Sequence, residues 1–341
     1  MPSAQGVDIS NTASRRLLGS ILLKQDTAMA IRTYQLGDEQ AQAEIYNAIA
    51  SALPGFKPST AAEIARRYSG ADPDPGSRYF AVANGEVVGY AVFSPNGRIS
   101  SPWCLPGAEA FREPLLETLL AEMRNRGLTE AWAAYRGDWS PVLDFLREHG
   151  FTEKRTMINY VAELSQLPAP ERLPSNRLIE PLKREDLRQL IALEPGLFAD
   201  IDEQALERFF WSNPFYGFPE SLFALKDGEH GKLVGAFLLV VNDRFADPTR
   251  IDSAMPCFRL GAFGTERERH KRVTGLFSCV FADQAEGEAL LSSALTSLGG
   301  RSPLSHFAAQ APSDAASLCE WYDRLFQRQG SFPILSRRLT S

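Results

Sequence analysis

The chain has 341 residues, which is long for one domain and comfortable for two. Hydrophobic residues make up 44% of it and charged residues 23%, as in an ordinary soluble globular protein. The formal charge of −6 argues against a surface built mainly for nucleic acid, although it leaves room for a local basic site.

The cysteines and apolar runs indicate a reducing, aqueous setting. The four cysteines lie far apart and form no CxxC pair, which favours reduced thiols in a cytoplasmic protein over disulfides or a zinc site. They are Cys104, Cys257, Cys279 and Cys319. We therefore expect no metal. No stretch approaches the roughly 20 apolar residues that span a bilayer, so we expect no membrane partner.

Residues 1–28 contain two arginines before a short apolar run. Gly19, Ser20 and Lys24 interrupt that run, and no convincing small-residue cleavage site follows it. We expect a flexible N-terminal extension here rather than a signal peptide, with the folded part beginning at Met29.

Strand and helix patterns follow one another in a fixed order through the first half of the sequence. A strand and a helix are followed by three strands, a helix, a strand, a helix and a closing strand, in residues 30–50, 78–103, 113–135 and 142–164. Asn84–Gly85 and Asn96–Gly97 are strong hairpin signals, and Gly127 is placed to end the helix before it.

The same order recurs in the second half, in residues 176–195, 221–243, 288–311 and 316–339. Both halves carry a Val-Gly pair before an apolar strand, and Gly299 takes the place of Gly127. The sequence therefore predicts an α/β (α+β) protein of two tandem domains, residues 29–164 and 177–341. A proline-rich linker, residues 165–176, joins them.

This order of elements, together with the Gly-aromatic phrase after the last helix of each half ("EHGF" and "RQGSF"), resembles the GCN5-related N-acetyltransferase superfamily. The resemblance covers both halves. It implies that each half is a splayed mixed β-sheet flanked by helices. It also implies that acetyl-CoA is the cosubstrate, with its pantetheine arm in the splay. Its pyrophosphate would lie on backbone N–H groups where the fourth strand turns into the next helix, which is also a physically favourable anion site.

The second half matches the superfamily's Q/R-x-x-G-x-G/A pattern as Gln284, Gly287 and Ala289, while an alternative frame places Ala285 and Gly287 at the small positions. The nearby acidic residues Asp283, Glu286 and Glu288 are unfavourable beside phosphates. The residues that the resemblance assigns to acetyl-CoA are Phe281, Ala282, Gln284, Ala285, Glu286, Gly287, Ala289 and Asp314.

The first half departs from that pattern. Phe111, Arg112 and Pro114 stand where the second half has Glu286, Gly287 and Ala289. Proline removes an N–H donor, and arginine brings bulk to a place where backbone should meet phosphate. Arg112 either binds phosphate itself or is an ordinary surface arginine. We expect the first copy to be degenerate and the C-terminal copy to bind acetyl-CoA.

Tyr322, on the last helix, stands where the superfamily places a tyrosine near the CoA sulfur, and the resemblance implies a general acid for the leaving thiolate. The alternative is a half-buried packing residue. Leu146 takes its place in the first half and cannot donate a proton. Ser313 or Asp314 would cap the helix that carries Tyr322.

The substrate side is less determined. His270 and Glu266 lie in a charged insertion, residues 243–272, and are candidates for the general base that takes the proton of the amine. The aromatic stretch 208–221 is expected either to line the acceptor pocket or to pack in the core. Its candidate substrate-binding residues are Phe210, Trp211, Phe215 and Tyr216.

The function that these patterns favour is acetyl-CoA-dependent N-acetylation of a small-molecule or peptide amine by the C-terminal domain. The alternative is a non-catalytic acyl-CoA-binding or regulatory protein with the same fold. We expect no nucleic-acid partner, and the sequence leaves homodimerisation open.

Overall fold

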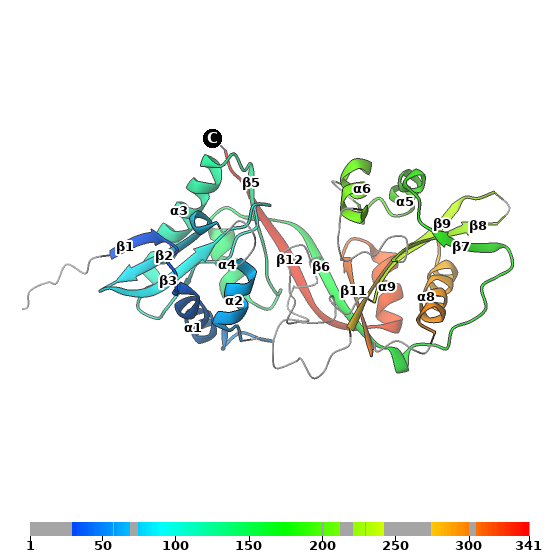
Figure 1. The fold of residues 1–341 in the computed structure, drawn as a ribbon, viewed down its shortest axis with the longest axis horizontal. Coiled ribbons are helices and arrows are strands. Elements are labelled where there is room, and N and C mark those ends of the chain that lie inside the picture. The colour runs from blue at the N-terminus through cyan, green and yellow to red at the C-terminus, as the bar shows by residue number, and fades with distance from the viewer. Residues whose placement is uncertain are drawn as a thin grey trace, which may run out of the picture.

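The computed structural model describes residues 29–56, 58–68, 74–198, 201–211, 221–228, 230–241, 274–299 and 305–340. Within these ranges the predicted order of strands and helices occurs twice (Figure 1). The first copy consists of β1 (Met29–Thr33), α1 (Asp38–Ala50), α2 (Ala61–Tyr68), β2 (Arg78–Ala83), β3 (Glu86–Val92), β4 (Trp103–Cys104), α3 (Arg112–Asn125), β5 (Glu130–Ala134), α4 (Ser140–Glu148) and β6 (Thr152–Glu163).

The second copy repeats this order after a connection that contains three prolines. Its elements are β7 (Arg177–Pro181), α5 (Leu187–Leu193), α6 (Glu203–Trp211), β8 (Leu222–Asp227), β9 (Leu233–Val240), β10 (Thr274–Phe281), α8 (Gln284–Leu298), β11 (His306–Pro312), α9 (Ala316–Leu325) and β12 (Gln327–Arg338).

Local sequence explains several of these boundaries. Asn84 (φ 55°) and Gly85 (φ 85°) both take the left-handed backbone conformation, which closes the β2–β3 hairpin without splaying its strands. Gly127 (φ 76°) and Gly299 (φ 60°) take it just after α3 and α8, where a residue without a Cβ ends a helix at no steric cost. The leucine stripe of α3 is fully buried, at Leu115, Leu116, Leu119 and Leu120.

The strands form two sheets, of which the larger joins the two copies. A four-stranded sheet has the order β1-β2-β3-β4, and an eight-stranded sheet has the order β5-β12-β6-β11-β10-β9-β8-β7. The closing strand of each copy therefore pairs with the other copy: β12 lies beside β5, and β6 lies beside β11. The two closing strands also pair with each other, and they cross the middle of the molecule side by side (Figure 1).

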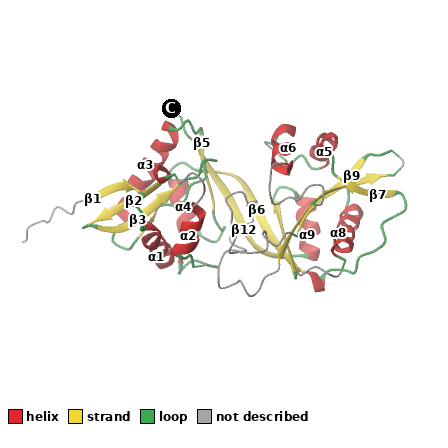
Figure 2. Cartoon of the chain, in the orientation of Figure 1, coloured by secondary structure: helices red, strands yellow, loops and turns green. Residues whose placement is uncertain are grey.

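Helices cover both faces of the second copy's part of the large sheet (Figure 2). Side chains alternate along β9: Phe237 and Leu239 belong to the core cluster under α8 and α9, whereas Ala236 and Leu238 belong to the cluster under α5 and α6. The first copy has its own cores, one of them built on the α3 leucines. In the ranges described above, no helix is long and apolar enough to cross a lipid bilayer.

Candidate active site

Strands β10 and β11 lie side by side and then diverge. They pair in parallel from Thr274 opposite His306 to Leu276 opposite Ala308. Beyond that point, among the described strands, β10 pairs only with β9, and β11 pairs only with β6. The wedge that opens between them, which we call the second splay, leaves one edge of each strand without a strand partner.

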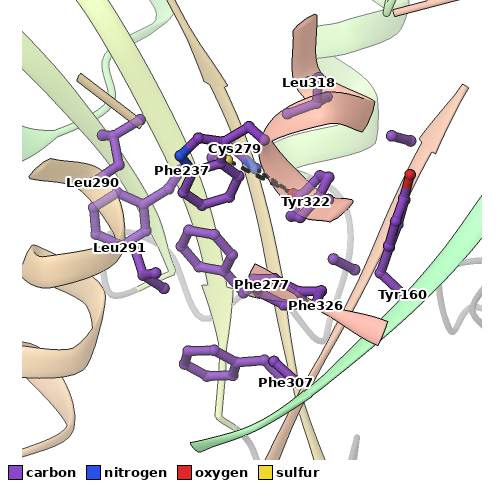
Figure 3. Close-up of a cluster of buried hydrophobic side chains, with 14 of the residues drawn as sticks. Tyr160, Phe237, Phe277, Cys279, Leu290, Leu291, Phe307, Leu318, Tyr322 and Phe326 are labelled. Carbon is purple, nitrogen blue, oxygen red and sulfur yellow. Dashed lines mark hydrogen bonds between the residues drawn. The ribbon is translucent and has the colours of Figure 1, made fainter. Parts of the chain in front are cut away.

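Tyr322 of α9 spans the second splay. Its hydroxyl oxygen accepts a hydrogen bond from the backbone N–H of Cys279 on β10, with 3.3 Å between oxygen and nitrogen (Figure 3). The Tyr322 side chain is 0% exposed. Because the N–H donates to the oxygen, the hydroxyl keeps its own proton for another acceptor. Burial raises the pKa of Tyr322 well above its ordinary value, so this hydroxyl stays protonated at neutral pH.

The wall of this site comes from both copies. The Tyr322 ring stacks on Tyr160 of β6, with 5.0 Å between ring centroids, and meets Phe326 edge-on at 5.1 Å. The thiol of Cys279 lies 3.7 Å from the Tyr322 hydroxyl. Burial raises the pKa of that thiol to about 12, so it remains a neutral thiol rather than a nucleophilic thiolate.

The N-terminus of α8 lies where β10 ends, and it is partly occupied by the protein itself. The Asp283 side chain caps the helix by accepting from the Glu286 N–H at 3.1 Å, and the Gly287 N–H donates to the Asp283 carbonyl. The Ala282 N–H donates to the Val234 carbonyl. The N–H groups of the first two helical residues, Gln284 and Ala285, have no acceptor in the described part of the chain.

The acidic side chains around this loop are less unfavourable than the sequence suggested. Glu286 is buried, and its Oε1 accepts from Nη2 and Nε of Arg177 on β7 at 2.5 and 2.8 Å. Glu288 pairs with Arg324 at 3.3 Å. Asp283 is exposed and keeps its carboxylate at the helix N-terminus, so it is the acidic group that an anion would meet there.

Gly287 has a structural reason to be glycine that the motif did not reveal. A Cβ at this position would lie 2.9 Å from ring atoms of Phe281 and from Nε1 of Trp321. Those distances are shorter than real Cβ contacts, so the small residue lets two buried aromatic side chains pack against the helix. The position that a side chain would occupy at this glycine therefore faces the packed core rather than a phosphate site. Ala289, two residues on, is partly buried against the same core cluster.

Asp314 does not cap α9, as we expected Ser313 or Asp314 to do. The helix begins at Ala316 with Ala315 as its N-cap residue, and no side chain accepts a hydrogen bond there. Instead, both carboxylate oxygens of Asp314 accept from Arg155 of β6, at 3.2 and 3.3 Å. Strand β6, which the first copy contributes to the second, therefore holds the Asp314 carboxylate in place. The sequence around Asp314 does not reveal this interaction.

The residues expected on the substrate side are only partly within the described ranges. Phe210 is buried, and Trp211 is half-buried with its ring 5.9 Å from that of Phe210. Both belong to the core under α5 and α6, which covers the sheet face opposite Tyr322. Phe215, Tyr216, Glu266 and His270 lie outside the described residues.

The first copy contains a corresponding wedge, which we call the first splay. Its strands meet in parallel only at the bridge between Arg98 and Trp132, where the Ile99 N–H donates to the Trp132 carbonyl at 2.8 Å. Beyond the bridge, the hydroxyl of Tyr135 accepts from the Ser101 N–H at 2.6 Å. Leu146, at the position of Tyr322, is fully buried.

Arg112 begins α3, and its guanidinium lies 4.0 Å from the centroid of the Phe145 ring. Its carbon lies over the ring face, which is the geometry of a cation–π contact. Arg112 therefore has a packing role. The first helical turn also contains Pro114, which offers no N–H to a ligand.

Three residues that contact the candidate site were missed from the sequence: Tyr160 and Cys279 beside Tyr322, and Arg177 beside the N-terminus of α8. Tyr160 stands in an ordinary alternating strand, and only the exchange of closing strands brings it to Tyr322. Metal ligands do not gather here: in the described ranges, no three side chains of His, Cys, Asp or Glu cluster closely enough to hold a metal ion.

Comparison with known proteins supports this architecture. No protein-family model matches the sequence, and no curated protein matches it. Among solved structures, a GCN5-related N-acetyltransferase from Sphaerobacter thermophilus superposes with a TM-score of 0.57 at 15% identity, over 92% of this chain and 96% of that one. A tandem GNAT protein from the clavulanic acid biosynthesis pathway superposes with a TM-score of 0.52 at 12% identity, over 92% and 99% of the two chains. The chain thus has the fold of the GCN5-related N-acetyltransferases, in two tandem copies.

Proposed function

We propose that this protein is an acyl-CoA-dependent N-acyltransferase that transfers an acetyl group to a small-molecule or peptide amine at the second splay. The observation that carries the proposal is the Tyr322 hydroxyl, held between diverging strands by the Cys279 N–H. The shared fold supports acyl transfer in general, and the choice of the C-terminal copy rests on this tyrosine and on the α8 N-terminus.

The residues present fit acyl-CoA at both ends of the site. The N–H groups of Gln284 and Ala285, which have no acceptor among the described residues, would hold the pyrophosphate, because a helix N-terminus binds anions through such donors. Arg177 and Arg324 neutralise two of the three nearby carboxylates. The thioester end would have to reach Tyr322, which belongs to a core of aromatic and aliphatic side chains.

Acyl-CoA supplies an activated thioester and a thiolate leaving group. Tyr322 is proposed to donate its proton to the departing sulfur: the Cys279 N–H holds its oxygen, and the neutral Cys279 thiol beside it is the group that the sulfur would replace as a partner of the hydroxyl. The Cys279 N–H also stabilises the negative charge that develops on the Tyr322 oxygen as the proton leaves. Glu266 and His270 are our proposed general bases for the ammonium proton of the amine.

Two observations favour a second candidate, a non-catalytic acyl-CoA-binding or regulatory protein. Tyr322 is 0% exposed, and the exposed Asp283 carboxylate sits on the N-terminus of α8. In a regulatory protein, Tyr322 would be a packing residue whose hydroxyl satisfies the Cys279 N–H, and binding would not be followed by transfer.

The deciding experiment is an isothermal titration of the full chain with acetyl-CoA, using a matched pair of variants. Ala285→Glu places a charge at the proposed pyrophosphate site, and Ala110→Glu places it at the corresponding exposed position of the first copy. An added carboxylate within a few ångströms of a phosphate should weaken binding about tenfold or more, while an acidic side chain near a helix N-terminus does not harm the fold.

We expect one site per chain, weakened by Ala285→Glu and unaffected by Ala110→Glu. Two sites, or loss on Ala110→Glu, would mean that the first copy binds acetyl-CoA. No binding by the wild type would refute the proposal. If acetyl-CoA binds, release of free thiol with a panel of polyamines, amino sugars and peptide N-termini separates the enzyme from the regulatory protein.

A further inference from the structure

Tyr160 belongs to the closing strand of the first copy, yet its ring lies beside Tyr322, the residue that spans the second splay. On β6 it is opposite Ala309 of β11, and its ring stands beside that of Tyr322 (Figure 3). The oxygen of Tyr160 points away from the rings of Phe277 and Phe307, toward the side of the cluster where Leu318 lies (Figure 3). The exchange of closing strands thus places a second phenol next to the first.

The hydroxyl of Tyr160 is buried, and it makes no hydrogen bond of normal geometry with the residues described, although the Cys319 thiol and the Arg328 guanidinium lie close enough to affect its pKa. The side chain is 1% exposed, and among the residues described its oxygen has no hydrogen-bond partner. The neighbouring Cys319 thiol donates instead to the Pro312 carbonyl at 3.2 Å. The polar pair Asn159–Gln310 is adjacent in sequence, but it lies on the opposite face of the sheet because side chains alternate along a strand.

Packing alone does not account for this hydroxyl. Native proteins pair nearly all their buried polar groups, and an unpaired one destabilises the fold, whereas phenylalanine would supply the same ring without that cost. A second unpaired group lies on another side of Tyr322: Nε1 of the fully buried Trp321, whose ring centroid is 5.2 Å from that of Tyr322. Unsatisfied donors thus cluster around the residue proposed to act on the thioester.

We infer that Tyr160 is a binding residue of the second splay, supplied by the first copy, and that its hydroxyl donates a hydrogen bond to a carbonyl of the acyl-pantetheine arm. This inference rests on the proposed function. The arm is uncharged and carries amide and thioester carbonyls, which suits an aromatic wall with few polar groups. Burial raises the pKa of Tyr160, and the hydroxyl therefore remains a donor at neutral pH.

Under this inference the first copy has a role even if it binds no acetyl-CoA itself. Its own splay is bridged by Tyr135, and its α3 N-terminus carries Arg112 and Pro114. Through β6 it nevertheless provides a wall of the second splay, so the site is composite. Removing the Tyr160 hydroxyl should then affect stability and binding in opposite directions. The buried hydroxyl destabilises the protein without ligand, and it stabilises the complex by hydrogen-bonding the ligand.

The test is Tyr160→Phe in the full chain, with Tyr135→Phe as the matched control. For Tyr160→Phe we expect a melting temperature without ligand that is equal to or higher than that of the wild type. We also expect the affinity for acetyl-CoA to be about three- to tenfold weaker, because one hydrogen bond to the ligand is lost. The Tyr135 hydroxyl has a partner, so Tyr135→Phe should lower the melting temperature and leave the affinity unchanged.

Free CoA as a second probe identifies the carbonyl. A loss with both CoA and acetyl-CoA assigns the contact to an amide of the arm, and a loss with acetyl-CoA alone assigns it to the thioester. Wild-type affinity in Tyr160→Phe, or a lower melting temperature without ligand, would overturn the inference while leaving the proposed function standing. Failure of the wild type to bind acetyl-CoA would instead remove the proposed function itself.

Discussion

The two splays satisfy the same physical requirement with tyrosines from different elements. In each copy the fourth strand loses its parallel neighbour, and a backbone N–H facing the wedge needs an acceptor. In the first copy the acceptor is Tyr135, three residues past Trp132 at the end of β5. In the second copy the position three residues past Ala308 is Ala311, and the acceptor is Tyr322 from the following helix.

The comparison separates what the fold demands from what a reaction would demand. A tyrosine across the wedge is needed in both copies for hydrogen bonding, so its presence alone does not indicate catalysis. Of the two, only Tyr322 is also stacked on a second buried phenol. It also lies in the copy whose α8 begins with two N–H groups that have no acceptor in the described ranges. The proposed activity therefore depends on the surroundings of the tyrosine, and the predictions below vary those surroundings.

The largest effect is expected from Tyr322→Phe, compared with Tyr135→Phe. If Tyr322 is the general acid, its loss should lower kcat about 100- to 10,000-fold, while acetyl-CoA binding changes less than about twofold. Tyr135→Phe should leave kcat unchanged. Steady-state thiol release, measured with whichever amine the panel identifies, tests both variants.

Equal losses of kcat in the two variants would show that bridging a wedge, rather than donating a proton, is what activity requires. Unchanged kcat in Tyr322→Phe would remove the proposed acid. Since both variants leave one backbone N–H unsatisfied, each serves as the stability control for the other.

The next effect concerns stability at the base of α8. The first copy has the buried, apolar Phe111 where the second copy has Glu286 paired with Arg177. Arg177→Met should destabilise the protein by about 3 kcal/mol, because it leaves a buried carboxylate without its partner. The double variant Arg177→Met/Glu286→Met, which copies the apolar solution of the first half, should recover most of that loss in urea denaturation. No recovery would mean that the ion pair does more than neutralise Glu286.

The smallest effect is expected on the free energy of unfolding at alkaline pH. Burial raises the pKa of both bridging tyrosines, and that of Tyr322 more strongly. Tyrosine in the unfolded chain ionises near pH 10, so folding stability from these groups is fully present below that pH. Above it, each group loses up to about 1.4 kcal/mol per pH unit until its folded-state pKa is reached, so the more strongly raised Tyr322 loses stability over a wider pH range than Tyr135. Urea midpoints measured between pH 8 and 11 should decline less steeply in Tyr322→Phe than in Tyr135→Phe. The reverse ranking would contradict this account.

The order of elements could be predicted from the sequence because it depends on local signals. Apolar periodicity, the Asn-Gly hairpin and the glycines after α3 and α8 each act within a few residues, and the structure has them where the sequence indicated. The doubled GCN5-related N-acetyltransferase fold followed from that order. Tyr322 was also placed correctly on the last helix, although its hydrogen bond to Cys279 was not foreseen.

The details of the site depend on partners that are distant in sequence. Glu286 was judged unfavourable because nothing near it reveals Arg177, and Asp314 was expected to cap a helix because nothing near it reveals Arg155. Gly287 fitted a phosphate motif while serving the packing of Phe281 and Trp321. A short motif shows that small residues leave room around the backbone, but it does not show whether a ligand or a neighbouring side chain fills that room.

The insertion of β12 between β5 and β6 has a consequence for synthesis on the ribosome. Strand β5 pairs with β12 across about 200 residues of sequence, so this edge of β5 has no native partner until β12 has emerged. An unpaired apolar edge of that kind is prone to pair with another chain while it waits. Folding of the first copy should therefore finish late, and the nascent chain should depend on chaperones more than two independently folding domains would.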